Sequence, residues 1–398
     1  MKSSVPSCGF FVLWIMILAM PGGMKAGSRQ VSLSVEQIQR QLKADEVMLE
    51  YFLTDSSAEV NAISQESSFF VNQSLDQIFW CSLRTFRKKM KSAEPSDFLF
   101  SGEVLYLFLI KPIEDFLAGR HRLIIIPDER LTGLPFEAFI RSDDLAVGAF
   151  GRDLHYLIHD FEVVYHSSRE CWNESALRRM TGQTDTGDFQ FAFIGFSPAF
   201  SHNKNSAALP RSKTEIAEIG EMFRQTGLSA RSLGDACTGR ECFKKMACLG
   251  KIVHLATHCI PPCRDRRESG FFICGQNHDG GKNRLWEGLL SGDDIEAMNL
   301  KADLIVLNAC GSGDGSWKSD ILPNSFPLIF IKAGARNIIS TLWNVNDNLA
   351  GDFMRDFYRS WLSGKSYSQA LREVKLQWIS CRETTIPTIW APYVLMGE

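Results

Sequence analysis

The sequence predicts an α/β protein with a mostly parallel sheet flanked by helices. Beyond residue 190, short apolar segments alternate with amphipathic ones, and this alternation requires crossover connections between parallel strands. Segments such as 122–127 (RLIIIP) and 302–307 (ADLIVL) are continuously apolar, as strands buried on both faces are. Hydrophobic residues make up 45% of the 398 residues and charged residues 22%. These values exclude a disordered or fibrous chain.

Charge and cysteine content narrow the possible functions. The chain has 43 basic and 46 acidic residues and a net charge of -3. No strongly basic face is implied, so we expect no nucleic-acid partner. The 11 cysteines are odd in number and unevenly spaced. This pattern argues against a fully paired disulfide framework and leaves room for a functional thiol.

The first 28 residues are treated as an apolar leader outside the fold. Residues 9–20 (GFFVLWIMILAM) carry no charge and follow a single Lys2. The segment is shorter than the roughly 20 residues of a membrane-spanning helix, but it has the length of a signal-peptide core. Two interpretations remain open. Residues 1–26 act as a signal peptide and the protein is exported, or translation starts at Met24 and a cytoplasmic location is favoured. We expect membrane contact only if the apolar segment is retained.

Residues 29–185 are predicted to form a first α/β part. Ser34 and Gln37 have the spacing of a capping box, which opens a helix within 33–44. The apolar and polar alternation that follows indicates a small group of antiparallel strands. Further along we expect helices at 75–91 and 101–118, a buried strand at 122–127 and a short helix at 134–140. The polar segment 167–189 is predicted to be a linker.

Residues 186–398 are predicted to form a second α/β part. The apolar strand segments lie within 189–196, 228–233, 251–257, 302–307 and 337–342. The helical segments between and after them are 212–225, a helix ending at 248, 291–298, 327–333, 348–362 and 366–380. The helix at 327–333 is followed by Gly334, a common residue at helix C-termini.

Two of the predicted strands lead into reactive side chains. In parallel sheets, ligands bind beyond the carboxyl ends of the strands. The strand at 251–257 leads to His258, and the strand at 302–307 leads to Cys310, which Gly311 follows. A thiolate attacks carbonyl carbon readily, and a nearby imidazolium lowers the pKa of a thiol. The pair therefore predicts a nucleophilic cysteine with a histidine base.

The same segments resemble the CHAT-domain family. HLATHC at 254–259 is similar to the family pattern His-Leu-Ala-Thr-His-Gly, and LNACGSG at 307–313 is similar to Leu-Ser-Ala-Cys-x-Thr-Gly. Other family-like stretches lie at 123–139, 209–219, 288–310, 334–347 and 390–397, so that the resemblance covers roughly 100–398. CHAT domains resemble caspases and separases, which are cysteine peptidases with a His–Cys dyad. The resemblance therefore implies a caspase-like fold with His258 and Cys310 as the dyad. It also implies that residues before the linker pack as a degenerate caspase-like half.

The resemblance also suggests roles for neighbouring residues. Cys259 stands where the family has a glycine whose N–H helps to form the oxyanion hole, so we expect the N–H groups of Cys259 and Cys310 to form it. A cysteine held at glycine-like backbone angles would be strained. Asn308 stands where related metacaspases place an acid that recognises basic substrates, and that acid is absent. Asn308, Gly311 and Asp347 are candidates for the substrate pocket.

A cluster of histidines and cysteines leaves a metal site as a weaker alternative. The cluster comprises His254, His258, Cys259, Cys263, Cys274 and His278. Some of the spacings are near those of structural zinc sites. On a strand, however, residues four apart lie about 13 Å from each other, so the two histidines of 254–258 could not share one zinc. We expect His254, on the core side of its strand, to be structural, and we expect no metal at the candidate site.

The sequence thus predicts a cysteine endopeptidase that acts on protein substrates without a metal or organic cofactor. A regulatory protein partner is expected as well, because the glycine- and serine-rich segment 311–326 follows the nucleophile and resembles a loop that orders on binding. The alternative is a catalytically inactive caspase-like module that binds other proteins. In that case His258 and Cys310 would be vestigial.

Overall fold

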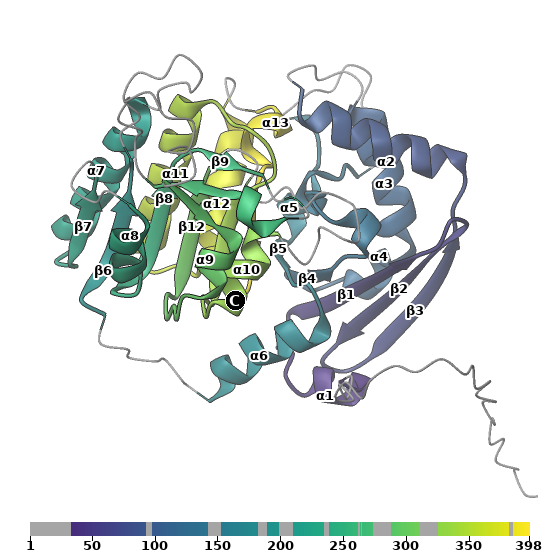
Figure 1. The fold of residues 1–398 in the computed structure, drawn as a ribbon. Helices are drawn as coiled ribbons and strands as arrows, with labels where there is room; N and C mark the ends of the chain where they lie inside the picture. The colour runs from purple at the N-terminus through teal and green to yellow at the C-terminus, as the bar shows by residue number, and fades with distance from the viewer. Residues whose placement is uncertain are drawn as a thin grey trace, which may run out of the picture. The chain divides into compact units, whose positions relative to one another are not determined.

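A large, mostly parallel sheet forms the centre of the computed structural model (Figure 1). The structure describes residues 33–92, 98–141, 153–181, 189–198, 210–234, 239–261, 263, 265–273, 288–309, 312, 325–381 and 385–398. In these residues the strand order of the eleven-stranded sheet is β3-β2-β1-β4-β5-β14-β13-β12-β8-β6-β7. Seven of its ten neighbouring strand pairs are parallel. The predicted α/β fold class is therefore confirmed.

The first part of the chain contributes one end of this sheet. Its elements are α1 (Val35–Gln39), β1 (Glu46–Leu53), β2 (Ser57–Ser64), β3 (Ser68–Ser74), α2 (Gln77–Met90), α3 (Phe98–Leu109), α4 (Glu114–Leu117), β4 (Arg122–Ile126), α5 (Leu157–Asp160), β5 (Glu162–Tyr165) and α6 (Arg169–Met180). The capping box of Ser34 and Gln37 forms as expected. Strands β1, β2 and β3 pair in antiparallel fashion, and β1 then pairs with β4 in parallel.

Three predicted elements differ in this part. The helix expected at 101–118 is interrupted, because Pro112 has no N–H group and starts a short 3₁₀ turn, Lys111–Ile113, between α3 and α4. The segment at 134–140 forms only a 3₁₀ turn, Phe136–Ala138. The expected linker at 167–189 contains α6, which Ser168 caps. The segment is polar because α6 is mostly exposed and buries only a narrow face with Trp172 and Ala176.

The second part of the chain supplies the remaining strands. Its elements are β6 (Phe191–Phe196), α7 (Pro210–Gln225), β7 (Ala230–Leu233), α8 (Arg240–Ala247), β8 (Gly250–Ala256), β9 (Cys259–Ile260), β10 (Gly270–Phe272), β11 (Leu289–Ser291), α9 (Gly292–Glu296), β12 (Leu304–Asn308), α10 (Phe326–Lys332), β13 (Asn337–Thr341), α11 (Asp347–Leu362), α12 (Tyr367–Ser380), α13 (Pro387–Trp390) and β14 (Tyr393–Met396). Strands β9, β10 and β11 form a separate small sheet.

Strand β14 joins the two parts of the sheet. It lies between β5 and β13, although the chain reaches it last. Met396 is in register with Tyr165 of β5, and the N–H of Gly397 bonds to the carbonyl of Tyr165 at 3.2 Å. Strands from both sides of residue 185 therefore belong to one sheet. The division into parts 29–185 and 186–398 stays a prediction.

Helices cover both faces of the second part of the sheet. Along β12, Leu304 and Val306 belong to the core cluster that includes α7, α11 and α12, whereas Ile305 and Leu307 belong to the cluster that includes α8, α9 and α10. All four side chains are fully buried. This explains why the strand segments are continuously apolar in the sequence.

A buried ion pair fastens α12 to the first part of the chain. Lys375 Nζ lies 2.9 Å from Glu137 Oε1, and both side chains are at most 2% exposed. Burial lowers the pKa of Lys375, an effect that the carboxylate of Glu137 opposes. Tyr165 at the end of β5 donates a short hydrogen bond to Glu137 as well. Removing one partner of such a pair would leave a buried charge without compensation.

In the part of the chain that the structure describes, no helix is both long enough and apolar enough to span a bilayer. The apolar segment 9–20 lies outside the described residues.

We predict that His166, which follows β5, makes the fold sensitive to acid. The side chain is 2% exposed, and its pKa falls to about 3 because of burial first and of the charges of Arg179 and Arg122 next. Below its ordinary pKa of 6.5, the unfolded chain binds a proton that the folded chain does not. The stability that this group contributes is complete above about pH 6.5 and is lost as the pH falls toward 3.

Urea unfolding between pH 4.5 and 7.5 would measure this effect. His166→Gln should flatten the pH dependence of the free energy of unfolding. Between pH 6.5 and 4.5 the parent protein should lose about 2–3 kcal/mol more of this free energy than the variant does. An equal slope in the variant and the parent protein would contradict the assignment.

Candidate functional site

The carboxyl ends of β8, β12 and β13 surround a small cavity of about 40 Å³. This is the edge of the sheet at which the sequence placed the candidate catalytic residues. The lining residues come from these strand ends, from α7 and from the start of α11: Ser212, Glu215, Ala256, Thr257, Asn308, Ala309, Thr341, Val345, Asp347 and Ala350. The cavity therefore lies between the strand that leads to His258 and the strand that leads to Cys310.

His258 lies two residues beyond the end of β8 and is half-buried. Its carbonyl accepts a hydrogen bond of 3.0 Å from the N–H of Phe272 in β10. The hydroxyl of Thr257 donates to the carbonyl of the same Phe272 at 2.6 Å. Strand β10 thus fixes the backbone at His258 after the chain leaves the large sheet.

Cys259 has an ordinary extended backbone. It lies in β9 opposite Phe271 of β10. Because the N–H of Phe272 bonds to the carbonyl of His258, the N–H of Cys259 points away from β10. Among the described non-glycine residues, Glu398 alone has a positive φ. Cys259 is therefore not held at glycine-like angles, and the condition under which strain was expected is not met.

Cys310 and Gly311 lie outside the described residues, but the residues on either side of them are firmly held. The N–H of Ser312 bonds to the carbonyl of Ala309 at 3.0 Å, and the fully buried Ser312 hydroxyl donates to the carbonyl of Leu307 at 2.8 Å. From β13, Thr341 donates its N–H to the Ser312 hydroxyl at 3.2 Å and its own hydroxyl to Ala309 at 2.8 Å. These bonds tie the chain on both sides of Cys310 to the ends of β12 and β13.

A buried carboxylate links the two strands that carry the candidate dyad. Glu215 projects from α7, and its side chain is 1% exposed. Asn308, the last residue of β12, donates to Glu215 Oε1 at 2.8 Å. On β8, His254 Nε2 is in polar contact with the same oxygen at 2.9 Å, although the approach lies outside hydrogen-bond geometry. The other ring nitrogen of His254 lies 3.1 Å from the hydroxyl of Tyr358.

Asp347 brings a second carboxylate to the cavity. It is the first residue of α11, and its Oδ2 accepts a hydrogen bond of 3.0 Å from the N–H of Arg211. Burial raises the pKa of Asp347, and the negative charge of Glu215 raises it further, whereas the hydrogen bond from Arg211 and the charge of His258 oppose the shift. No residue that lines the cavity, among those described, carries a positive side chain. The cavity is therefore negative in character.

The structure brings some predicted residues together and adds others. Asn308 and Asp347 line one cavity, and His258 lies close enough for its charge to act on Asp347. Their assignment to a substrate pocket stays a prediction. Sequence reasoning missed Glu215 and Ser312. For Glu215 a signal was present: a carboxylate stands beside the buried stripe of α7 that Ile216, Ile219 and Phe223 form. The sequence offered no comparable signal for Ser312.

The histidine and cysteine cluster of the alternative metal site lies only partly within the residues that the structure describes. Segment 250–256 is a strand, as expected, so that His254 and His258 do not share a helix face. Within the described residues, no group of three histidine, cysteine, aspartate or glutamate side chains is arranged to hold a metal ion. Cys274 and His278 of the predicted cluster lie outside the described residues.

Comparison with known proteins gives a match to a family model, two similar sequences and two similar structures. The family model of the CHAT domain matches residues 100–398. Tetratricopeptide repeat protein 28 of Mus musculus and that of Homo sapiens are 30% and 29% identical over 114 residues, which make up 29% of this chain and 5% of each relative. The chain thus corresponds to a small fraction of these relatives.

Two crystal structures of the Saccharomyces cerevisiae separase–securin complex resemble the fold. Each has a TM-score of 0.50 and covers 90% of this chain and 30% of the solved chain, at 10% and 9% identity. At such low identity the likeness concerns the fold alone.

We predict that Glu215 is a principal support of the strand ends. Glu215→Ala would leave Asn308 and His254 without their buried partner, and it should lower the free energy of unfolding by about 2–3 kcal/mol. Glu218→Ala, one turn along the same helix, removes a partly exposed carboxylate that pairs with Arg355, and it should cost less than about 1 kcal/mol. Denaturant unfolding measures both. An equal loss of unfolding free energy in the two variants would show that Glu215 contributes no more to stability than the partly exposed Glu218.

Proposed function

Because the chain belongs to the CHAT-domain family, whose model matches residues 100–398, we propose that it is a cysteine endopeptidase that cleaves protein substrates. Its fold is that of the caspase- and separase-like clan, as the separase structures indicate. The observation that carries the proposal is the cavity at the carboxyl ends of β8 and β12. These two strands lead directly to His258 and Cys310, a base and a nucleophile suited to acyl transfer.

The proposed reaction has two steps. The thiolate of Cys310 attacks the scissile carbonyl carbon, and a C–S bond forms as the carbonyl oxygen takes up negative charge. His258 donates a proton to the amine as the C–N bond breaks. A water molecule, deprotonated by His258, then attacks the thioester, which releases the acid product and the thiol. No metal or organic cofactor takes part in these steps.

Backbone N–H groups would stabilise the oxyanion that forms in both steps. We assign this role to the N–H groups of Cys310 and Cys259. The direction of the Cys259 N–H, away from β10, supports the assignment. The alternative of an inactive binding module relied mainly on cysteine in place of glycine at this position. Because Cys259 has an ordinary extended backbone, its backbone angles give no support to that alternative.

The charge of the cavity favours a substrate with a cationic side chain. Two carboxylates, Glu215 and Asp347, reach the cavity from α7 and α11, and the pKa of Asp347 is raised by burial first and by repulsion from Glu215 as well. A lysine or arginine side chain of a substrate would relieve this repulsion. Asn308 itself is neutral, so the negative charge near the strand ends comes from Glu215 of α7 and Asp347 of α11. We therefore propose cleavage after a basic residue.

We also propose that a second protein regulates the peptidase. The separase structures are complexes with securin, and segment 311–326 directly follows the proposed nucleophile. Apart from Ser312, residues 311–324 lie outside the described residues.

The first prediction of this proposal concerns the dyad. Cys310→Ala should reduce peptide hydrolysis by at least about 1,000-fold, since removal of a covalent nucleophile leaves only binding and oxyanion stabilisation. His258→Ala should have a similar effect. Cys81→Ala, which removes an exposed thiol on α2, should retain the activity of the parent protein. Substantial hydrolysis by a folded Cys310→Ala protein would overturn the assignment of the nucleophile.

The second prediction concerns specificity. In a peptide library, lysine or arginine should precede the cleaved bond, because the cavity is negative. Asp347→Asn should lower kcat/KM for these peptides by about tenfold relative to neutral peptides, the usual worth of one charged hydrogen bond. Asp352→Asn is the matched control, since Asp352 binds Arg211 but does not line the cavity. Preference for acidic residues, or an equal loss in both variants, would contradict the proposed pocket.

A further inference from the structure

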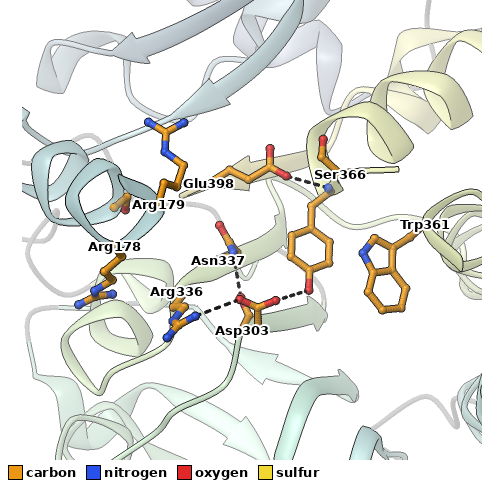
Figure 2. Close-up of a pocket in the computed structure, with 10 residues that line it drawn as sticks. Arg178, Arg179, Asp303, Arg336, Asn337, Trp361, Ser366 and Glu398 are labelled. Carbon is orange, nitrogen blue, oxygen red and sulfur yellow. Dashed lines mark hydrogen bonds and ion pairs between the residues drawn. The ribbon is translucent and has the colours of Figure 1, made fainter. Parts of the chain in front are cut away.

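A second cavity, of about 290 Å³, opens at the opposite edge of the sheet (Figure 2). Asp303 immediately precedes β12 and Asn337 opens β13, so this cavity lies at the amino ends of strands whose carboxyl ends form the candidate catalytic site. It is lined by α6 on one side and by α11 and α12 on the other: Ser175, Arg178, Arg179, Asp303, Arg336, Asn337, Trp361, Ser366, Tyr367 and Glu398. We propose that it binds a small phosphate-bearing molecule of the size of a nucleoside monophosphate.

Arginine side chains from two separate segments meet at this cavity. Figure 2 shows Arg178, Arg179 and Arg336 on one side of the cavity and Trp361 on the other. Arg178 lies 3.9 Å from Glu174, Arg179 donates a hydrogen bond of 3.3 Å to Glu46, and Arg336 lies 3.8 Å from Asp303. These separations are longer than those of a good charge-assisted hydrogen bond, about 2.7–2.9 Å. The two guanidinium groups of α6 therefore keep donor capacity that a phosphate would use in its preferred bidentate geometry.

The carboxylates at the cavity are already engaged at short range. Asp303 accepts a hydrogen bond of 2.8 Å from the hydroxyl of Tyr367. Glu398 lies 2.7 Å from Arg122 and accepts a 2.8 Å bond from the N–H of Tyr367, at the start of α12. The charge of Glu398 is thus compensated by Arg122, and Asp303 pairs with Arg336 at 3.8 Å. Among the described residues that line the cavity, three arginines face two carboxylates, so the formal charge of the lining is positive.

A buried polar atom indicates that the ligand also carries a hydrogen-bond donor. Asn337 is 6% exposed, and its Nδ2 donates to the carbonyl of Asp303 at 2.9 Å. Its Oδ1 is buried and has no hydrogen-bond partner in the described structure. Such an acceptor is costly to leave unsatisfied. A hydroxyl on the ligand would satisfy it, as the sugar of a nucleotide can.

Aromatic rings complete the cavity. The rings of Trp361 and Tyr367 stack with centroids 5.7 Å apart and an interplanar angle of 12°, and both residues line the cavity. An aromatic wall opposite guanidinium groups suits a planar ring joined to a phosphate. A ligand of this kind would connect α6 with the amino ends of β12 and β13. The site is independent of the proposed peptidase chemistry.

Titration calorimetry and thermal unfolding of the full chain would test this site with inorganic phosphate, pyrophosphate, adenosine monophosphate and citrate as probes. Adenosine monophosphate should bind and raise Tm, more tightly than inorganic phosphate and far more tightly than citrate. Arg178→Gln and Arg336→Gln should each weaken binding by about tenfold or more. Arg231→Gln is the control, since Arg231 is exposed on the edge strand β7 and stacks on Phe191 instead of lining the cavity.

Several outcomes would overturn the proposal. Failure of adenosine monophosphate and pyrophosphate to bind at millimolar concentration would exclude a phosphate site. Binding that both cavity variants leave unchanged would place the anion elsewhere. Citrate binding as tight as that of adenosine monophosphate would show a general anion site without selectivity for phosphate. Because Arg178 is a partly exposed helix residue with only a 3.9 Å ion pair, Arg178→Gln keeps the test valid even if Arg336→Gln fails to fold.

Discussion

The carboxylate of Glu215 is the contact on which the candidate site depends. It extends from α7 into a region with almost no solvent access and meets Asn308 of β12 and His254 of β8 at one oxygen. These two strands lead to Cys310 and His258, and their polar residues lie two and four positions before the proposed nucleophile and base. A displacement of α7 would therefore act on both strand ends together.

The surrounding bonds extend this arrangement to the neighbouring elements. Tyr358 of α11 supports the far side of His254, and Asp347 at the start of the same helix reaches the cavity. On the other side of β12, Ser312 and Thr341 tie the chain around Cys310 to β13. Polar groups buried at this density are stable only when most of them have partners. The negative cavity is thus a consequence of how the strand ends are held together.

Much of this architecture could be predicted from the sequence. Continuous apolar segments such as 302–307 indicate strands that are covered on both faces, and the alternation with helices indicates a parallel sheet. The positions of His258 and Asn308 at strand ends follow from the same pattern. Strand β14 could not be predicted, because a four-residue segment near the end of the chain contains no information about its insertion between β5 and β13. Segment 167–189 was misjudged, since the exposed helix α6 buries little more than Trp172 and Ala176.

The origin of the negative cavity was also beyond sequence reasoning. Asn308 stands two residues before Cys310, where metacaspases carry an acid. The sequence next to Cys310 therefore gives no sign of a carboxylate. The carboxylates come instead from Glu215, 93 residues earlier in the chain, and from Asp347. Only the packing of α7 and α11 against the sheet reveals that the two approach one cavity. The backbone angles of Cys259 could not be predicted for a similar reason, because the pairing of β9 with β10 sets them.

We propose that the strand ends form a cysteine peptidase site that accepts a basic side chain. The most direct test is to incubate the protein with a peptidyl acyloxymethyl ketone that ends in arginine and to locate the adduct by tandem mass spectrometry. We expect one adduct per chain, on Cys310, and it should form much more slowly when arginine is replaced by aspartate or when His258 is replaced by alanine. No adduct, or an adduct spread over other cysteines at similar rates for both peptides, would contradict it.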